Sequence, residues 1–187
     1  MRAMKLRFSR LLPAASSGLK QQNMPTIRVQ TEDFNLAEEL HALRGENAPL
    51  PLGATTRNPS IGAVVSFIGL VRDMNDGVGV SALTLEHYPA MTEKALAQIV
   101  ADAESRWRLL DCTVIHRVGE LKPTDQVVLV MVASAHRGDA FLACEFIMDF
   151  LKTKAPFWKK ERTLEGERWV DARASDDAAA KKWQSGV

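Results

Sequence analysis

The sequence predicts an α+β fold in which helices pack against a mixed, mostly antiparallel sheet. Some segments repeat apolar residues at helical spacing, whereas others alternate or run continuously apolar. These helix-like and strand-like segments are interleaved along the chain. The turn Pro123-Thr124-Asp125 joins two neighbouring strand-like segments as a hairpin would. Hairpins argue against a sheet wound only from parallel strands.

Length and composition favour one domain. A chain of 187 residues with 46% hydrophobic content can bury roughly 70% of the surface that it exposes when unfolded. Lys and Arg total 24 and Asp and Glu total 23, so no bulk charge draws the chain to nucleic acid or membrane. No apolar run approaches the length of a membrane span. Any site for an anion must therefore be local.

The cysteine content points to a reducing compartment. Cys112 and Cys144 are too few for a disulfide framework and lack the spacing of metal ligands. We therefore expect a cytoplasmic location and no metal site. Cys144 falls in the apolar stripe of a predicted helix, which makes it a poor candidate for an activated thiolate.

The N-terminal segment differs from the rest of the chain. Residues 1–24 contain five basic side chains and no acidic one. We expect them to form a disordered extension, with Met24 as an alternative start. A targeting peptide would show the same basic bias, so that reading stays open. We expect a single domain over residues 25–187.

The first elements follow from local signals. Residues 26–30 read as a short strand, and Asn35 is placed to cap the amphipathic helix that follows. Residues 45–60 contain three prolines and two glycines, so they predict a long loop. Residues 61–71 are nearly all apolar and rich in β-branched side chains, as in a buried strand. That strand delivers Arg72 to its end.

The later elements continue the same pattern. Residue spacing predicts a strand over residues 81–88, a helix over 91–107, strands over 112–118 and 126–135, a helix ending at residue 154, and a polar C-terminal helix ending near residue 183. His136 and Arg137 then lie at a junction between a strand and a helix.

The segment around Pro156 is the most informative part of the sequence. Proline disfavours helical geometry at Ala155, so the helix should stop there and the chain should continue extended. Lys152 and Lys159 then flank a sharp change of direction, where both ammonium groups could approach one small anion. The alternative is that these lysines are solvated and Lys152 simply meets the negative end of the helix dipole.

Cationic side chains also follow the ends of other elements. Arg72 follows one buried strand, and His136 and Arg137 follow another. Arginine can grip phosphate oxygens with two parallel hydrogen bonds, and histidine can add another. The pattern favours a site for a small phosphorylated molecule, although each arginine alone could be a surface ion-pair partner. No phosphate loop, zinc site or Ser/His/Asp arrangement is present at recognisable spacing.

Six motifs carry a resemblance to a known family. They are GAVVSFIG at 62–69, LTLEHYP at 83–89, MTEKAL at 91–96, VIHRVGEL at 114–121, SAHR at 134–137 and KTKAPFWKKE at 152–161. In order and spacing they closely resemble the catalytic large subunit of molybdopterin synthase. The resemblance runs from about Gly62 to Trp183. The loop over residues 45–60 looks longer than is usual in that family.

The resemblance implies an α/β hammerhead-type fold and a homodimer flanked by two small ubiquitin-like sulfur-carrier subunits, a heterotetramer. In that family the carrier's C-terminal Gly-Gly thiocarboxylate enters a pocket of the large subunit. Two sulfurs pass in turn to cyclic pyranopterin monophosphate and form the dithiolene of molybdopterin. The resemblance implies no cofactor and no catalytic cysteine, because the sulfur arrives on the carrier.

Matching positions imply the site residues. Lys152 and Lys159 correspond to catalytic lysines, which also bind substrate. The remaining substrate-binding positions are Val71, Arg72, His136, Arg137, Lys160, Glu161 and, from the neighbouring subunit, Arg173. The family commonly has a lysine where this chain has Leu70, and the loss of that cation could weaken phosphate binding or shift the task to Arg72.

Other functions remain as alternatives. A non-catalytic adaptor would bind a ubiquitin-like tail at the Phe157-Trp158 corner and form no dithiolene. A cysteine-dependent sulfurtransferase would need an exposed and reactive Cys144. The neutral charge balance makes a nucleic-acid-binding module the least favoured.

Overall fold

The computed structural model describes residues 24–45, 58–75, 77–170 and 174–183. The described elements, in chain order, are β1 (Thr26–Gln30), α1 (Leu36–Leu43), β2 (Ala63–Leu70), β3 (Met74–Asn75), β4 (Val78–Gly79), β5 (Ala82–His87), α2 (Pro89–Arg106), β6 (Leu109–Arg117), β7 (Gly119–Leu121), β8 (Gln126–Ser134), α3 (Arg137–Lys154), β9 (Phe157–Thr163), β10 (Gly166–Val170) and α4 (Ala174–Lys181).

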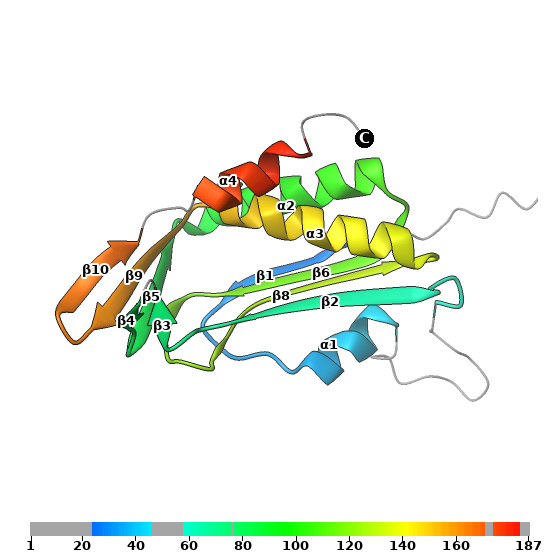
Figure 1. Ribbon diagram of the computed structural model, residues 1–187. Coiled ribbons are helices and arrows are strands. Elements are labelled where there is room, and N and C mark those ends of the chain that lie inside the picture. Colours follow the sequence, from blue (N-terminus) through cyan, green and yellow to red (C-terminus); the bar gives the residue numbers. More distant parts are fainter. Residues whose placement is uncertain (1–23, 46–57, 76, 171–173, 184–187) are drawn as a thin grey trace, which may run out of the picture.

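Two sheets organise the molecule. The larger one has the strand order β1-β6-β8-β2, in which β1 is parallel to β6 and the other pairs are antiparallel. The second has the order β10-β9-β5-β7 and is antiparallel throughout. In Figure 1, α2 and α3 cover one face of the larger sheet and α1 lies on the other, while the second sheet stands at one end. The predicted α+β fold with a mixed, mostly antiparallel sheet is confirmed.

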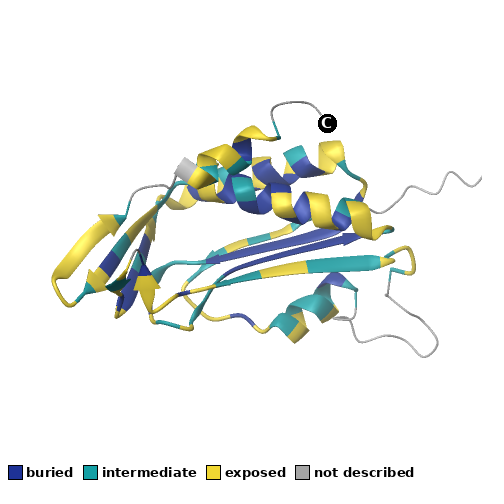
Figure 2. Cartoon of the chain, in the orientation of Figure 1, coloured by how far each residue is buried: buried dark blue, intermediate teal, exposed yellow. Residues whose placement is uncertain are grey.

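The core lies on both faces of β6 and β8, which are buried along most of their length (Figure 2). Side chains alternate along these strands because successive residues point to opposite faces. Cys112 and Val114 pack under α2 and α3, whereas Ile115, Leu129 and Met131 pack toward α1. Cys112 is therefore part of the core. No helix among the described residues is long and apolar enough to cross a membrane.

Most predicted elements lie within a few residues of the observed ones. The Asn35 side chain caps α1 by accepting a hydrogen bond from the Ala37 N–H at 3.0 Å. The segment after Arg72 contains the short hairpin β3-β4. The strand β7 was not expected, because three residues carry too little periodicity to predict a strand. The helix α2 starts earlier than predicted, at Pro89, since proline fits the first helical position. Residues 1–23 and 46–57, which hold most of the predicted extension and loop, lie outside the described residues.

His116 is a buried histidine between the two sheets. Its ring stacks on Phe157 with 3.8 Å between centroids, and its Nδ1–H donates to the carbonyl oxygen of Arg117 at 2.8 Å. Burial lowers the pKa of His116 from 6.5 to about 4. The hydrogen bond to the Arg117 carbonyl opposes this shift, and the positive charge of Lys159 adds a smaller decrease. The imidazole is therefore neutral at physiological pH.

This histidine should make stability depend on pH. Between about pH 4 and pH 6.5 the unfolded chain protonates His116 and the folded chain does not. Its contribution to the free energy of unfolding is fully present above pH 6.5 and is lost as the pH falls through that window. Urea denaturation at a series of pH values gives the free energy of unfolding of the native chain and of His116→Phe. Plotted against pH, the two free energies should converge toward low pH. A constant difference between them from pH 4 to pH 8 would contradict this account.

Gly62 permits a close approach at the end of the larger sheet. Its N–H donates to the carbonyl of Ser134 at 3.0 Å, and a Cβ at this position would overlap the carbonyl oxygen of Ala135. We expect Gly62→Ala to lower the free energy of unfolding by about 1–3 kcal/mol, as overpacking does.

Gly138 provides the matched control, because it lies in the first turn of α3 and a Cβ there would meet nothing within 4 Å. Gly138→Ala should keep or raise stability, since alanine is the better helix former. Chemical denaturation of both variants tests the contrast, and equal stabilities would show that the contact at Gly62 can relax.

Candidate functional site

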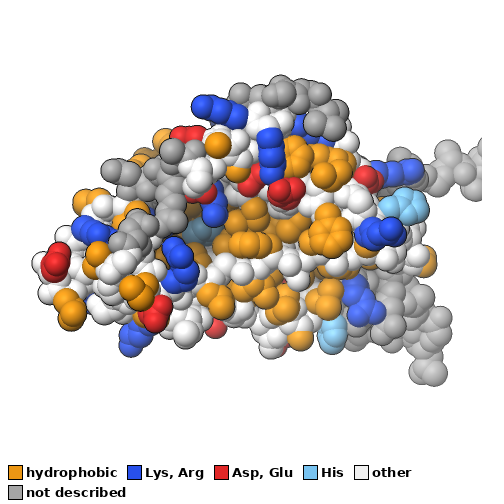
Figure 3. Space-filling model, in the orientation of Figure 1, with side chains coloured by type: hydrophobic (Ala, Val, Ile, Leu, Met, Phe, Trp, Pro, Cys, Tyr) orange, Lys and Arg blue, Asp and Glu red, His pale blue; other side chains and the backbone are white. Residues whose placement is uncertain are grey.

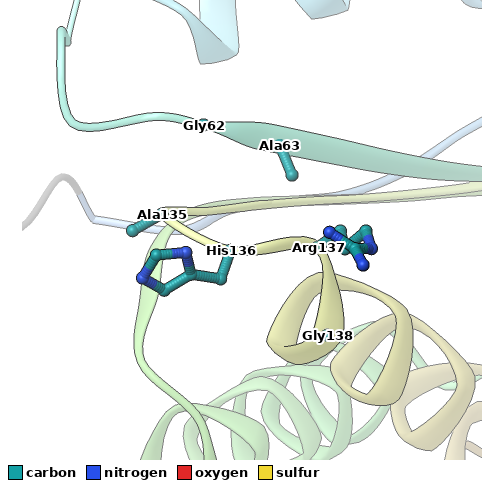
Figure 4. A pocket seen from close by; sticks show the side chains of 6 residues that line it. All are labelled: Gly62, Ala63, Ala135, His136, Arg137 and Gly138. Carbon is teal, nitrogen blue, oxygen red and sulfur yellow. The ribbon is translucent and has the colours of Figure 1, made fainter.

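The N-terminus of α3 forms the first cationic region. His136 is the N-cap residue, with φ −130° and ψ 141°, and Arg137 is the first helical residue. Both side chains are exposed and line a cavity of about 390 Å³ with Gly62, Ala63 and neighbouring backbone. In Figure 4 the imidazole lies beside Ala135, whereas the Arg137 side chain extends in the other direction. The free N–H groups of a helix start add to the attraction for an anion.

The corner after α3 has the geometry that Pro156 dictates. Ala155 is extended, with φ −79° and ψ 127°, which ends the helix as predicted. The Phe157 N–H donates to the Ala155 carbonyl at 2.9 Å, and the buried Thr92 hydroxyl donates to the Pro156 carbonyl at 3.4 Å. Together with the stacking of Phe157 on His116, these contacts fix the change of direction between Lys152 and Lys159.

Lys152 lies in the last turn of α3, at a second cavity. This cavity has a volume of about 350 Å³ and lies between α3 and β2. Its lining is largely apolar and includes Phe67, Phe141 and Met148. The Lys152 ammonium lies 3.7 Å from a carboxylate oxygen of Asp176 in α4, with about half of its side chain exposed to solvent. Figure 3 shows hydrophobic side chains gathered along this face of the molecule.

Lys159 and Glu161 share one face of β9. They alternate with Lys160, because successive side chains along a strand point to opposite faces. Lys159 lies close enough to His116 for its charge to lower the pKa of that histidine. Glu161 is buried and accepts hydrogen bonds from Asn75 at 2.7 Å and from Arg168 at 3.0 and 3.2 Å.

Arg72 lies in the same region as Glu161 of β9. It follows the buried residue Val71, and its Nη2 lies 3.5 Å from Oδ1 of Asn75. The Val71 N–H donates to the Asp125 carbonyl at 2.9 Å, which anchors the chain where Arg72 leaves the sheet. Arg72, Glu161 and Lys159 therefore belong to one region at the second sheet.

Lys160 belongs to a different surface. It lies 3.0 Å from Glu167 and 5.5 Å from the centroid of the Trp169 ring. Its hydrogen bond and charge lower the pKa of Glu167. These partners lie in β10, and the alternation of β9 turns Lys160 away from the face of Lys159.

The predicted site residues thus fall into separate regions of one protomer. Arg137 and Lys152 lie near opposite ends of α3, about 22 Å apart along the helix axis at 1.5 Å per residue. One phosphate group cannot contact both. Neither of the two described cavities includes both Lys152 and Lys159. Arg173 lies outside the described residues.

The cysteines and potential metal ligands add no reactive centre. Burial raises the pKa of the Cys144 thiol to about 11, with a further contribution from Glu145, and burial also raises the pKa of Cys112. Both thiols are therefore protonated at neutral pH. Within the described residues, no three His, Cys, Asp or Glu side chains are grouped to hold a metal ion.

Sequence reasoning missed three side chains in these regions. Asp176 pairs with Lys152, and Asn75 and Arg168 bind Glu161. Asn75 lies next to a glycine-containing turn. Because asparagine is common at turns, its presence there gave no reason to assign it to a site. Arg168 stands directly opposite Glu161 in the β9-β10 register, a pairing that a charge-complementary hairpin could have predicted.

Comparison with known proteins agrees with these observations. A molybdopterin synthase catalytic subunit from Ralstonia nicotianae is 62% identical over 160 residues, covering 86% of this chain and 85% of that protein. The structure of a molybdopterin biosynthesis MoaE protein from Burkholderia ambifaria matches with a TM-score of 0.69 and 54% identity, covering 86% of this chain and 99% of that one. A Helicobacter pylori complex of subunits 1 and 2 of molybdopterin-converting factor shares the fold, with a TM-score of 0.61 and 18% identity over 79% of this chain and 91% of that one.

A family model described as "MoaE protein" matches residues 29–154, most of the described chain. The resemblance carried by the six motifs is therefore confirmed. The chain belongs to the MoaE family, the catalytic subunits of molybdopterin synthase.

Proposed function

We propose that this chain transfers sulfur from the thiocarboxylated C-terminus of a small carrier subunit to cyclic pyranopterin monophosphate, forming the molybdopterin dithiolene. The family assignment supports the synthase activity in molybdenum cofactor biosynthesis. The observation that carries the chemical proposal is the placement of cations at both ends of α3 and beside the Pro156 corner.

The reaction brings two anions together. The acceptor carries a cyclic phosphate and the donor is a thiocarboxylate, so their encounter requires positive groups that offset the repulsion. Lys152 would neutralise and position the thiocarboxylate. Its present partner, Asp176, forms a half-exposed ion pair at 3.7 Å, and such pairs are weak enough for an incoming anion to replace. Lys159 would bind the phosphate or move a proton as the ring opens.

A second copy of the chain would complete this site. The strand β2 lies at the edge of the larger sheet and leaves one row of backbone groups without a partner strand among the described residues. Phe67 on β2 and Phe141 on α3 are both exposed and line the same cavity between β2 and α3. A long apolar edge is an association surface, and a two-fold contact uses the same patch on both copies.

Antiparallel pairing of β2 with its counterpart would bring the separated cations together. Within one protomer α3 and β2 run in the same direction, because both are antiparallel to β8 (Figure 1). A two-fold axis at the centre of β2 would therefore place the start of α3 from one copy near the end of α3 from the other. His136 and Arg137 of one protomer would then face Lys152 and Arg72 of its partner, which resolves the separation of about 22 Å.

The small carrier is the proposed partner protein. The Helicobacter pylori structure that shares this fold holds two different subunits together. A flexible C-terminal tail would have to reach Lys152, and the apolar cavity between α3 and β2 opens next to that residue. The raised pKa of the Cys144 thiol disfavours a cysteine-dependent transfer. The sulfur then travels only on the carrier.

The function is tested by reconstitution with thiocarboxylated carrier and cyclic pyranopterin monophosphate. Lys152→Ala should lower the rate of dithiolene formation by about 100-fold or more, because a charge that contacts the reacting groups is lost. Lys159→Ala should lower it as well. Product is measured directly as the dithiolene.

Lys154→Ala is the matched control, since Lys154 lies in the same helical turn and stacks its ammonium on Phe150 at 4.0 Å. We expect its rate to stay within about twofold of the native chain, as is usual for a surface substitution. Carrier binding without any dithiolene from the native chain would support the adaptor function instead. Near-normal turnover by Lys152→Ala would refute the proposed role of that lysine.

A further inference from the structure

The buried carboxylate of Glu161 is surrounded by three hydrogen-bond donors from two other strands. Its Oε1 accepts from Nδ2 of Asn75 at 2.7 Å, and its Oε2 accepts from Nε and Nη2 of Arg168 at 3.2 and 3.0 Å. Glu161 is 5% exposed and Asn75 is 8% exposed. A buried carboxylate needs such partners, because an unpaired charge away from water is costly.

Asn75 also faces a second charge. Nη2 of Arg72 lies 3.5 Å from Oδ1 of Asn75, at the long end of hydrogen bonding. The amide therefore lies between the Arg72 guanidinium and the Glu161 carboxylate, with its acceptor toward one and its donor toward the other. The backbone carbonyl of Asn75 accepts from Arg168 at 3.4 Å, so both ends of this residue are held.

This arrangement keeps two opposite charges apart. Without the amide, the exposed Arg72 could form an ion pair with Glu161. The Glu161 carboxylate would then neutralise the positive charge of Arg72. Arg168 already supplies a positive partner to Glu161 through two donors. Arg72 is thus held by a neutral group and keeps its charge for an external anion.

We propose that Asn75 is a positioning residue that orients Arg72 and keeps its guanidinium available for the phosphate of the substrate. The proposal rests on the function proposed above for the identity of that anion. The amide makes no contact with substrate and acts only through Arg72. Two anchors set the position of Arg72: the hydrogen bond from the Val71 N–H to the Asp125 carbonyl, and the bond from Arg168 to the Asn75 backbone.

A double-mutant cycle separates this role from a structural one. The measurement is the dissociation constant of cyclic pyranopterin monophosphate for the full chain without carrier, by calorimetry. Asn75→Ala should weaken binding by about threefold to tenfold, the range that one hydrogen bond contributes. In an Arg72→Ala background the same substitution should change binding by less than about twofold, because its effect passes through Arg72.

Gln98→Ala is the matched control, because it truncates an amide that bonds Asp102 on the exposed surface of α2. Its dissociation constant should equal that of the native chain. If thermal denaturation shows that Asn75→Ala does not fold, Asn75→Ser takes its place, since a hydroxyl keeps a small donor and acceptor.

Equal losses from the Asn75 substitution in both backgrounds, or no loss in either, would overturn the proposal. Failure of the native chain to bind the pterin would overturn it as well. Because this measurement omits the carrier and the transfer of sulfur, its outcome is separate from the reconstitution. A positive cycle with no dithiolene product would refute the proposed reaction and leave the role of Asn75 supported.

Discussion

The length of α3 is the constraint on which the arrangement of this protein depends. The helix carries His136 and Arg137 at its start and Lys152 in its last turn, about 22 Å farther along its axis. A helix packed against β8 and β2 cannot bend to bring these ends together. A site that needs both groups of cations must therefore be assembled from two chains. The strand β2 runs in the same direction as α3, and none of the described strands pairs with its outer edge, so this edge offers the contact that would do so.

The second requirement is that the cations keep their charge. Lys152, Arg72 and Arg168 differ in how strongly a carboxylate of the protein neutralises them. Lys152 has an exposed and weak partner in Asp176, whereas Arg168 neutralises the buried Glu161 through two donors. Within the described part of the chain, the Arg72 guanidinium hydrogen-bonds to a neutral amide, the Asn75 side chain. Arg168 is thus the cation that neutralises the buried carboxylate, whereas Lys152 and Arg72 remain in weaker contacts.

Sequence reasoning predicted the elements better than the site. The break at Pro156 and the cap at Asn35 act within a few residues, so local chemistry determines them. The position of Lys160 on the opposite face from Lys159 also follows from strand alternation. The distance between Arg137 and Lys152 follows from the length of the 18-residue helix α3. Noting that cations lie at the ends of elements does not give the distances between them. The contact between Asn75 and Glu161 joins residues 86 positions apart, and no periodicity reports such a pair.

The central claim is that one protomer supplies Lys152 and its partner supplies Arg137. It is tested most directly by pairing Lys152→Ala and Arg137→Ala, each of which we expect to be inactive as a homodimer, in a heterodimer purified through two different tags. If the site spans two chains, one of its two sites keeps both residues, and dithiolene formation should return to about half of the native rate. If each site lies within one chain, both sites stay defective and the heterodimer should be as inactive as either parent, which would contradict the account.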